Sequence, residues 1–184
     1  MIECLRDKKW ISDNGRAMKD FTSIPAILKQ AEIFENLMTE QLELVASIST
    51  LITCNTGDII IEQGSASDEL YIIADGEVDI LMDPSLTGES SVSEQIIITT
   101  LRRGQSFGEM ALVDQEIRSA SARCGQQDTR LVVIPRLKLM ELCQAHPDLG
   151  YRLMHNLAAD LAAKIRTADT QMREWLTWSH GRSI

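Results

Sequence analysis

The sequence lacks the features that mark membrane and secreted proteins. No apolar run approaches the roughly 20 residues that a helix needs to cross a bilayer. The N-terminal stretch MIECLRDKKW interrupts its apolar residues with charges, unlike a secretory signal. No Cys-x-x-Cys pair occurs, and we interpret the cysteines as buried or incidental thiols in a reducing compartment: Cys4, Cys54, Cys124 and Cys143. We therefore expect a cytoplasmic protein with no membrane partner.

Basic residues are scarce and scattered. The chain has 18 Lys and Arg against 27 Asp and Glu, a formal net charge of -9, and no basic block. Because neutralisation of backbone phosphates supplies most nucleic-acid affinity, this composition argues against a nucleic-acid surface. A basic niche in an acidic protein can still attract one small anion. The charge balance therefore limits the macromolecular partner and leaves a small anionic ligand open.

Histidine is also scarce, which bears on catalysis. The three histidines, His146, His155 and His180, lie in or near the predicted C-terminal helices and outside the predicted strands. A jelly-roll metalloenzyme of the cupin type needs His and carboxylate ligands on its strands. A Ser-His or Cys-His nucleophile pair needs a histidine beside the nucleophile. We therefore expect no catalytic residue, no metal, no cofactor and no enzymatic activity.

Short apolar segments between glycine turns occupy the middle of the chain. Turns are predicted at residues 55–58 and 63–65, and Asp75-Gly76 has the residue types of a hairpin turn. The predicted strands begin near Leu51 and continue over residues 59–61, 70–74, 78–82, 96–101, 120–124 and 131–134. This spacing predicts a mainly β fold, an antiparallel jelly-roll β-barrel over residues 51–135. The polar stretch over residues 84–95 is interpreted as a solvated loop.

Helical patterns flank the predicted barrel. N-terminal helices are predicted over residues 25–50 and C-terminal helices over residues 136–178, with a break at His146-Pro147. Residues 1–24, with a turn signal at Asp13-Asn14-Gly15, fit either a short helix with a loop or a partner-dependent arm. The expected organisation is therefore an N-terminal segment, 1–24, and a single domain over residues 25–178.

The last helix has two apolar faces. Leu149, Leu153 and Leu157 are spaced by four residues and are expected to face the barrel. Residues 158–175 then continue with apolar steps of three and four, the pattern of a coiled-coil seam: Ala158, Leu161, Ile165, Ala168, Met172 and Trp175. One interpretation is a helix lying on its own domain. The other, which we favour because the helix is long, is a two-fold homodimer through 158–175.

The stretch GQSFGEMALVDQEIRSASA, residues 104–122, combines several groups that recognise anions. Gly108 permits a tight turn, and a helix begins after it, so that the first amides, from Met110 to Leu112, are expected to be free for an anion. Arg118 offers a planar fork of donors, and Ser119 adds a hydroxyl. Glu109 would repel a simple phosphate, but it suits a ligand that pairs one negative charge with a hydroxyl. A nucleoside 3',5'-cyclic monophosphate has this combination.

These residues resemble the phosphate-binding cassette of the cyclic nucleotide-binding domain family, which includes the catabolite activator protein and the regulatory subunit of protein kinase A. The family pattern is Gly-Glu-x-Ala-Leu, a short gap, then Arg-(Ala/Ser/Thr)-Ala. The matching residues, and the expected ligand-binding set, are Phe107, Gly108, Glu109, Met110, Ala111, Leu112, Arg118, Ser119 and Ala120. The resemblance implies that Glu109 accepts the ribose 2'-OH and that Arg118 pairs with the cyclic phosphate. It extends over roughly residues 33–168, with Ile117 standing where many members have Pro.

The resemblance also implies a residue of the last helix as a lid over the base, with Lys164, Ile165 and Thr167 as candidates. We expect a regulatory domain that binds cAMP, with cGMP as the second choice, and that signals to a downstream protein by moving its helices. No DNA-binding or kinase module is expected after the last helix. The alternative is a nucleotide-independent dimerisation or partner-docking domain that keeps the fold.

Overall fold

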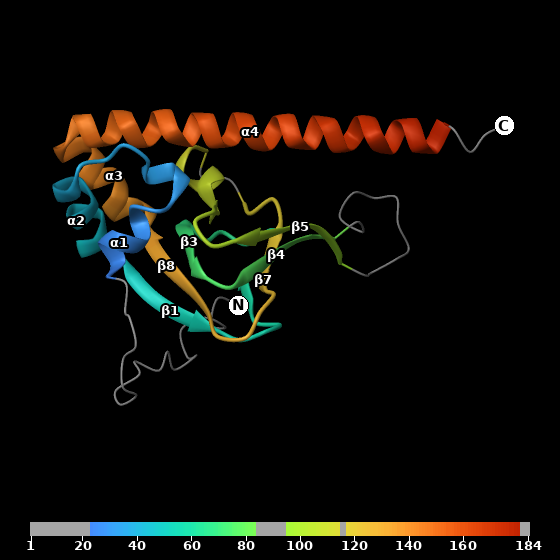
Figure 1. Cartoon of the computed structure of the whole chain (residues 1–184), viewed down its shortest axis with the longest axis horizontal. Coiled ribbons are helices and arrows are strands. Elements are labelled where there is room, and N and C mark those ends of the chain that lie inside the picture. The colour runs from blue at the N-terminus through green and yellow to red at the C-terminus, as the bar shows by residue number, and fades with distance from the viewer. Residues whose placement is uncertain (1–22, 84–94, 115–116, 181–184) are drawn as a thin grey trace.

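The computed structural model describes residues 23–83, 95–114 and 117–180 (Figure 1). Its strands form two four-stranded antiparallel sheets. The first sheet has the order β1 (Thr50–Cys54), β8 (Thr129–Pro135), β3 (Glu69–Asp75) and β6 (Ser106–Phe107). The second has the order β2 (Ile59–Ile61), β7 (Ser121–Cys124), β4 (Glu77–Met82) and β5 (Ile96–Arg102). The predicted fold class is confirmed, although the described strands do not close into a continuous barrel.

Strand β3 is buried on both of its faces. Tyr71 and Ile73 belong to the cluster packed between the two sheets, whereas Leu70 and Ile72 belong to a second cluster shared with the helices. Successive side chains of a strand point to opposite faces, so both faces of β3 require apolar residues. This explains why the sequence ELYIIAD reads as a continuous apolar run rather than as an alternating strand.

The chain changes sheets at Asp75-Gly76, and the predicted hairpin there is wrong. Strand β3 pairs with β6 and β8, whereas β4 pairs with β5 and β7. Gly76 does adopt a left-handed backbone conformation, with φ of 90°. That conformation turns the chain out of one sheet and into the other, so the residue types of a turn were identified correctly but not the strands that the turn joins.

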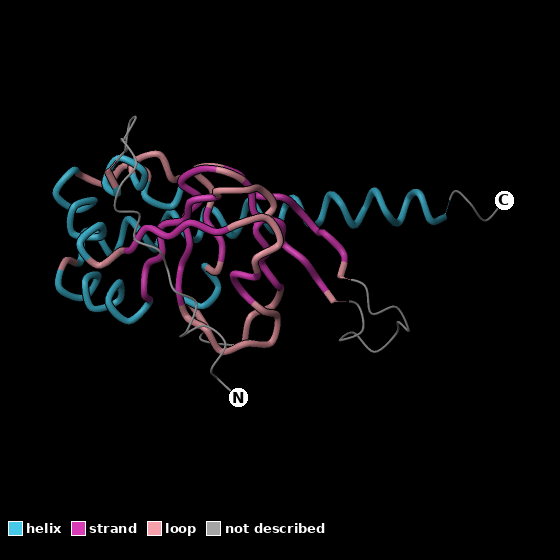
Figure 2. The backbone as a smooth tube through the Cα atoms, turned by 90° about the horizontal axis from the view of Figure 1, so that it is seen from below, coloured by secondary structure: helices cyan, strands magenta, loops and turns pink. Residues whose placement is uncertain are grey.

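The shorter helices gather at one end of the sheets (Figures 1 and 2). They are α1 (Ile24–Leu28), the 3₁₀ helix η1 (Glu32–Phe34), α2 (Thr39–Ser47) and α3 (Arg136–Ala145). The first predicted helix divides into α1 and η1 because Ala31 is extended, with ψ of 130°. This break lets Leu28 and Phe34 both enter the helical cluster, where they are 0% and 1% exposed.

Helix α4 (Pro147–His180) spans the molecule and continues past the sheets (Figure 1). The expectation for its inner face is confirmed, because Leu149, Leu153 and Leu157 are buried. Further along, Ile165 and Met172 are 61% and 63% exposed. In the described part of the chain, no helix is both long and apolar enough to cross a membrane.

Three sequence expectations fall partly or wholly outside the described residues. These are the structure of residues 1–22, the loop over residues 84–94, and the side chain of Trp175 in the proposed seam.

Candidate functional site

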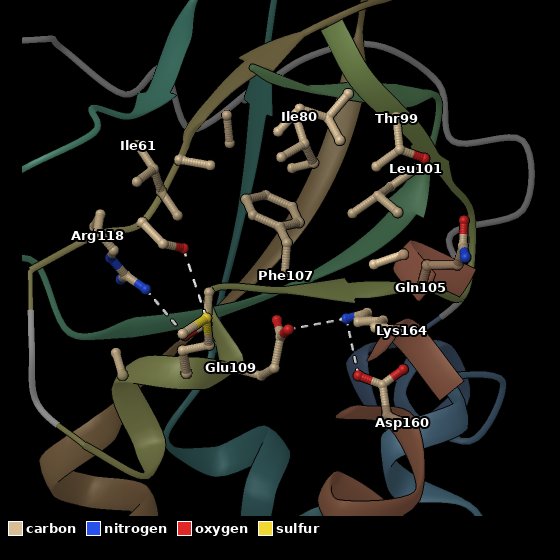
Figure 3. A pocket seen from close by; sticks show the side chains of 18 of the residues that line it. Ile61, Ile80, Thr99, Leu101, Gln105, Phe107, Glu109, Arg118, Asp160 and Lys164 are labelled. Atoms are coloured by element: carbon tan, nitrogen blue, oxygen red, sulfur yellow. Dashed lines mark hydrogen bonds and ion pairs between the residues drawn. The ribbon is translucent and has the colours of Figure 1, made fainter. Parts of the chain in front are cut away.

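A pocket of about 490 Å³ lies between the second sheet, the turn after β6 and helix α4 (Figure 3). Its volume is within the range of small-molecule sites. The side formed by the strands is mainly apolar and includes Ile61, Ile80, Leu101 and Phe107, while charged side chains occupy the side nearest α4 and the turn. The site can therefore hold a ligand with one apolar and one charged end.

The turn that begins the cassette depends on Gly108. Its φ is 78°, and an added Cβ would lie 2.8 Å from both Arg118 Nη1 and the Glu69 carbonyl oxygen. After it comes the four-residue 3₁₀ helix η3 (Glu109–Leu112). In a 3₁₀ helix each N–H bonds to the carbonyl three residues back, so the Leu112 amide is used within the helix. The Leu112 amide therefore leaves the expected set of free amides, and the anion-binding role of the earlier ones stays a prediction.

Arg118 is held in place from several sides and is only 6% exposed. Its backbone N–H donates to the Ser65 carbonyl at 2.9 Å. In its side chain, Nε donates to Ser67 Oγ at 2.9 Å, Nη1 to the Gly108 carbonyl at 2.9 Å and Nη2 to the Glu69 carbonyl at 2.8 Å. A guanidinium has five N–H donors, so these bonds fix its plane while leaving capacity for an anion in the pocket.

Glu109 forms an ion pair with α4. Its Oε1 lies 3.1 Å from Lys164 Nζ, which also lies 2.8 Å from Asp160 Oδ2 and donates to the Ser106 carbonyl at 3.1 Å (Figure 3). Glu109 is 8% exposed, and Lys164 is the cation paired with its buried carboxylate. Burial lowers the pKa of the Lys164 ammonium, but the charges and hydrogen bonds of Glu109 and Asp160 outweigh burial and leave that pKa above its ordinary value. Lys164 therefore stays charged and ties α4 to the cassette.

The structure brings eight of the nine expected cassette residues to the pocket wall: Phe107, Gly108, Glu109, Met110, Ala111, Arg118, Ser119 and Ala120. Leu112 is instead buried in the helical cluster, where it packs under the turn. Ser119 Oγ is exposed and lies 3.6 Å from Met110 Sδ. Among the lid candidates, Lys164 and Thr167 line the pocket, whereas Ile165 is exposed and lies outside its lining.

Sequence reasoning missed the residues that contact the cassette but lie far from it in the chain. Ser67 and Glu69, which accept from Arg118, lie 51 and 49 residues before it in the chain. Asp160 was missed as well, although its i,i+4 spacing from Lys164 is a signal that could have indicated the pair. The alternation of Val78, Ile80 and Met82 predicted a half-buried strand but not that Ile80 lines a ligand pocket.

The pocket wall combines a buried cation with a buried anion. A buried guanidinium and a buried carboxylate lie on one wall, and no histidine lines the pocket. In the described part of the chain, no group of three or more His, Cys, Asp or Glu is placed to hold a metal ion. The arrangement provides complementary contacts for an anion and for a hydroxyl.

Replacing Lys164 with methionine is expected to lower the free energy of unfolding by about 1–2 kcal/mol, because Glu109 then keeps a buried charge without its cation. Removing one partner of a fully buried pair costs more, but the Lys164 side chain is 34% exposed, so solvent screening reduces the loss. Urea unfolding measures the difference. Lys138→Met is the matched control on the exposed face of α3, and an equal effect of the two substitutions would contradict the role of the pair.

Comparison with known proteins gives a family match that covers this part of the chain. Residues 51–146, more than half of the chain, match the family model described as cyclic nucleotide-binding domain. The matched region runs from the first strand through α3 and includes the whole cassette.

Similar proteins include known regulators. The cyclic AMP receptor protein of Thermus thermophilus is 32% identical over 145 residues, covering 79% of this chain and 62% of that protein. The cAMP-dependent protein kinase regulatory subunit of Schizosaccharomyces pombe is 28% identical over 106 residues, covering 58% of this chain and 23% of that protein. The crystal structure of the Thermus thermophilus catabolite activator protein superposes with a TM-score of 0.65 at 30% identity, covering 79% of this chain and 63% of that one. The chain thus spans less than two thirds of the length of these relatives, and it belongs to the cyclic nucleotide-binding domain family.

Proposed function

We propose that this chain is a regulatory domain without enzymatic activity that binds a cyclic nucleotide, cAMP in preference to cGMP. The observation that carries the proposal is the presence of a buried Arg118 and a buried Glu109 on the wall of one pocket. Both groups have protein partners, and a cyclic nucleotide adds an anion for the remaining N–H donors of Arg118 and a hydroxyl that can donate to Glu109. The preference for cAMP rests on the similarity to a cyclic AMP receptor protein.

In this proposal each residue of the cassette has a distinct role. Arg118 pairs with the cyclic phosphate, supported by the free amides at the start of η3, and Ser119 adds a hydroxyl beside it. Glu109 accepts the ribose 2'-OH. The base lies against β4 and β5, where Ile80, Thr99 and Leu101 line the pocket. Thr167 of α4 also lines the pocket and is the candidate lid residue.

The proposed output is a movement of α4. Ligand can shift α4 only if it binds one position of the helix more tightly than another, and the contact of Lys164 with Glu109 is the place where ligand and helix meet. We propose that the domain over residues 25–178 acts in the cytoplasm as a homodimer through 158–175, with residues 1–24 as a separate segment. Exposed Ile165 and Met172 support the dimer, since the described residues of the chain leave both of them largely uncovered. The downstream partner protein would contact either residues 158–175 or residues 1–24.

A second candidate is a dimerisation or docking domain that does not respond to nucleotide. One observation favours it: Glu109 and Arg118 already have protein partners, Glu109 with Lys164 and Arg118 with three acceptors. A ligand must compete with these contacts.

Thermal melting with each nucleotide separates the two candidates. With cAMP at a hundred times its dissociation constant, stability should rise by about 2.7 kcal/mol, which corresponds to roughly 5–10 °C in Tm for a chain of this size. We expect a smaller rise with cGMP and none with non-cyclic 5'-AMP. An unchanged Tm with both cyclic nucleotides would favour the docking domain.

A further inference from the structure

Two buried thiols lie in contact between the sheets. Cys54 is the last residue of β1 in the first sheet, and Cys124 is the last residue of β7 in the second. Their Sγ atoms are 2.9 Å apart, and the side chains belong to residues that are only 4% and 1% exposed. The pair could not be predicted from local sequence patterns, because 70 positions separate the two residues.

The backbone around the pair is fixed by hydrogen bonds. The Cys124 N–H donates to the Asp58 carbonyl at 2.8 Å, and the Gly57 N–H donates to the Cys124 carbonyl at 2.8 Å. The turn that follows Cys54 is thereby bound directly to the strand that carries Cys124. Since a disulfide has an S–S length of about 2.05 Å, the sulfur atoms at 2.9 Å need to approach by less than about 1 Å to bond.

We propose that Cys54 and Cys124 form a redox-sensitive pair, which a peroxide converts into a disulfide that covalently joins the two sheets. In the first step one thiolate attacks a peroxide oxygen, breaks the O–O bond and becomes a sulfenic acid, releasing water from hydrogen peroxide. In the second step the other thiol attacks the sulfenic sulfur and releases a second water. The two thiols lose two electrons and two protons in total, and one peroxide is reduced to two waters.

This disulfide would close a loop of the chain that carries many residues of the ligand pocket. The 70-residue span between the cysteines contains β2 to β6 and the cassette, and β7 itself contributes Ser121 and Ala122 to the pocket wall. A cross-link that closes a loop of this length restricts the unfolded chain strongly. Oxidation would therefore stabilise the sheet pair that holds the binding site.

Burial sets the speed of the reaction. Burial is the largest cause that raises the pKa of the Cys54 thiol above its ordinary value, and the neighbouring Cys124 raises this pKa further. The reactive thiolate is consequently scarce at neutral pH. The pair should remain reduced under ordinary reducing conditions and oxidise slowly on exposure to peroxide, faster at pH 9 than at pH 7.

The test uses the full chain carrying Cys4→Ser and Cys143→Ser, which leaves only the pair. The protein is treated with hydrogen peroxide at pH 7 and pH 9, alkylated in denaturant and digested without reduction for mass spectrometry. We expect loss of both free thiols, a peptide linking Cys54 to Cys124, and a Tm higher by roughly 10 °C that dithiothreitol reverses. The same chain with Cys124→Ala is the control, and it should give neither the linked peptide nor the rise in Tm.

Two results would overturn the proposal. One is full alkylation of both cysteines after peroxide treatment at pH 9, which would show that the thiols touch but do not bond. The other is a disulfide found only between separate chains on a non-reducing gel. Because every readout is independent of nucleotide, failure here would leave the proposed ligand binding untouched.

Discussion

Replacing Arg118 with alanine is expected to weaken cyclic nucleotide binding by at least about a hundredfold. A charge-assisted hydrogen bond contributes about 1.5–3 kcal/mol, and a guanidinium can make two to a phosphate. The same substitution should lower the free energy of unfolding by about 2–4 kcal/mol, because Ser67 Oγ and the carbonyls of Gly108 and Glu69 all lose their donor. Isothermal titration with cAMP, at a temperature where circular dichroism shows the variant folded, measures the affinity.

Two matched variants separate binding from folding in that experiment. Arg123→Ala removes a guanidinium from the same stretch of chain. Arg123 pairs with Asp79 at 3.4 Å and does not line the pocket, so the affinity of this variant for cAMP should remain unchanged. Arg118→Lys keeps the charge and loses the planar fork, and it should bind more weakly than the natural chain. If Arg118→Ala and Arg123→Ala bind cAMP equally well, Arg118 does not hold the phosphate.

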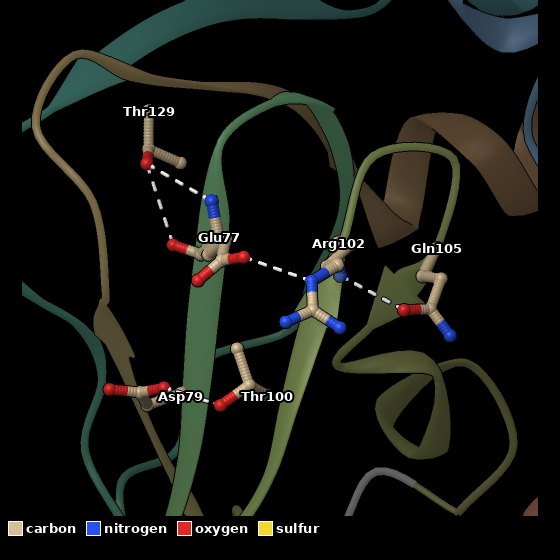
Figure 4. Close-up of polar contacts among 6 residues, drawn as sticks. All are labelled: Glu77, Asp79, Thr100, Arg102, Gln105 and Thr129. Carbon is tan, nitrogen blue, oxygen red and sulfur yellow. Dashed lines mark hydrogen bonds and ion pairs between the residues drawn. The ribbon is translucent and has the colours of Figure 1, made fainter.

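Gly76→Ala is expected to have the largest effect on stability, a loss of roughly 3–5 kcal/mol. Gly76 has φ of 90°, and an added Cβ would lie 2.3 Å from Thr129 Oγ1 and 2.9 Å from Thr129 Cα. Thr129 cannot move aside easily, because it is 0% exposed and its hydroxyl donates to the Gln126 carbonyl at 2.8 Å. The same hydroxyl lies 3.4 Å from both the N–H and the carbonyl of Glu77 (Figure 4). Strain in the backbone and overlap with a buried strand therefore add together.

Gly57→Ala is the matched control for this prediction. Gly57 has the same φ of 90°, but a Cβ there would meet nothing within 4 Å. Its loss should be only about 1 kcal/mol, the cost of the left-handed conformation alone. Urea unfolding of both variants gives the comparison. Equal losses would mean that the space around Thr129 adjusts without cost.

Much of the candidate site was predictable because its residues lie close together in the chain. Glu109 and Arg118 are nine positions apart, and in the described cassette residues, 107–114 and 117–120, a short turn and a 3₁₀ helix help to bring both to the same pocket. The existence of the strands also followed from local patterns of apolar residues and glycine turns. The roles of Glu109 and Arg118 as ligand contacts remain predictions that the experiments above test.

The parts that were missed depend on contacts between distant segments. The turn at Asp75-Gly76 has local features of a hairpin, but the partners of β3 and β4 are chosen by pairing with β8 and β7. Likewise, the contact between Lys164 and Glu109 requires α4 to cross the mouth of the pocket, which no short window of sequence reveals. Local patterns identify elements, whereas the packing of the whole core decides which elements meet.

Helix α4 has the geometry of a lever. Its inner face is fixed near Leu157, which is 2% exposed, while Lys164 lies seven residues further along and Met172 fifteen. With a rise of 1.5 Å per residue, these points are about 10 Å and 22 Å from the fixed end. A tilt that lifts Lys164 by about 1 Å would move Met172 by about 2 Å. A small displacement at the pocket is thus roughly doubled at the part of the helix that no other described element covers.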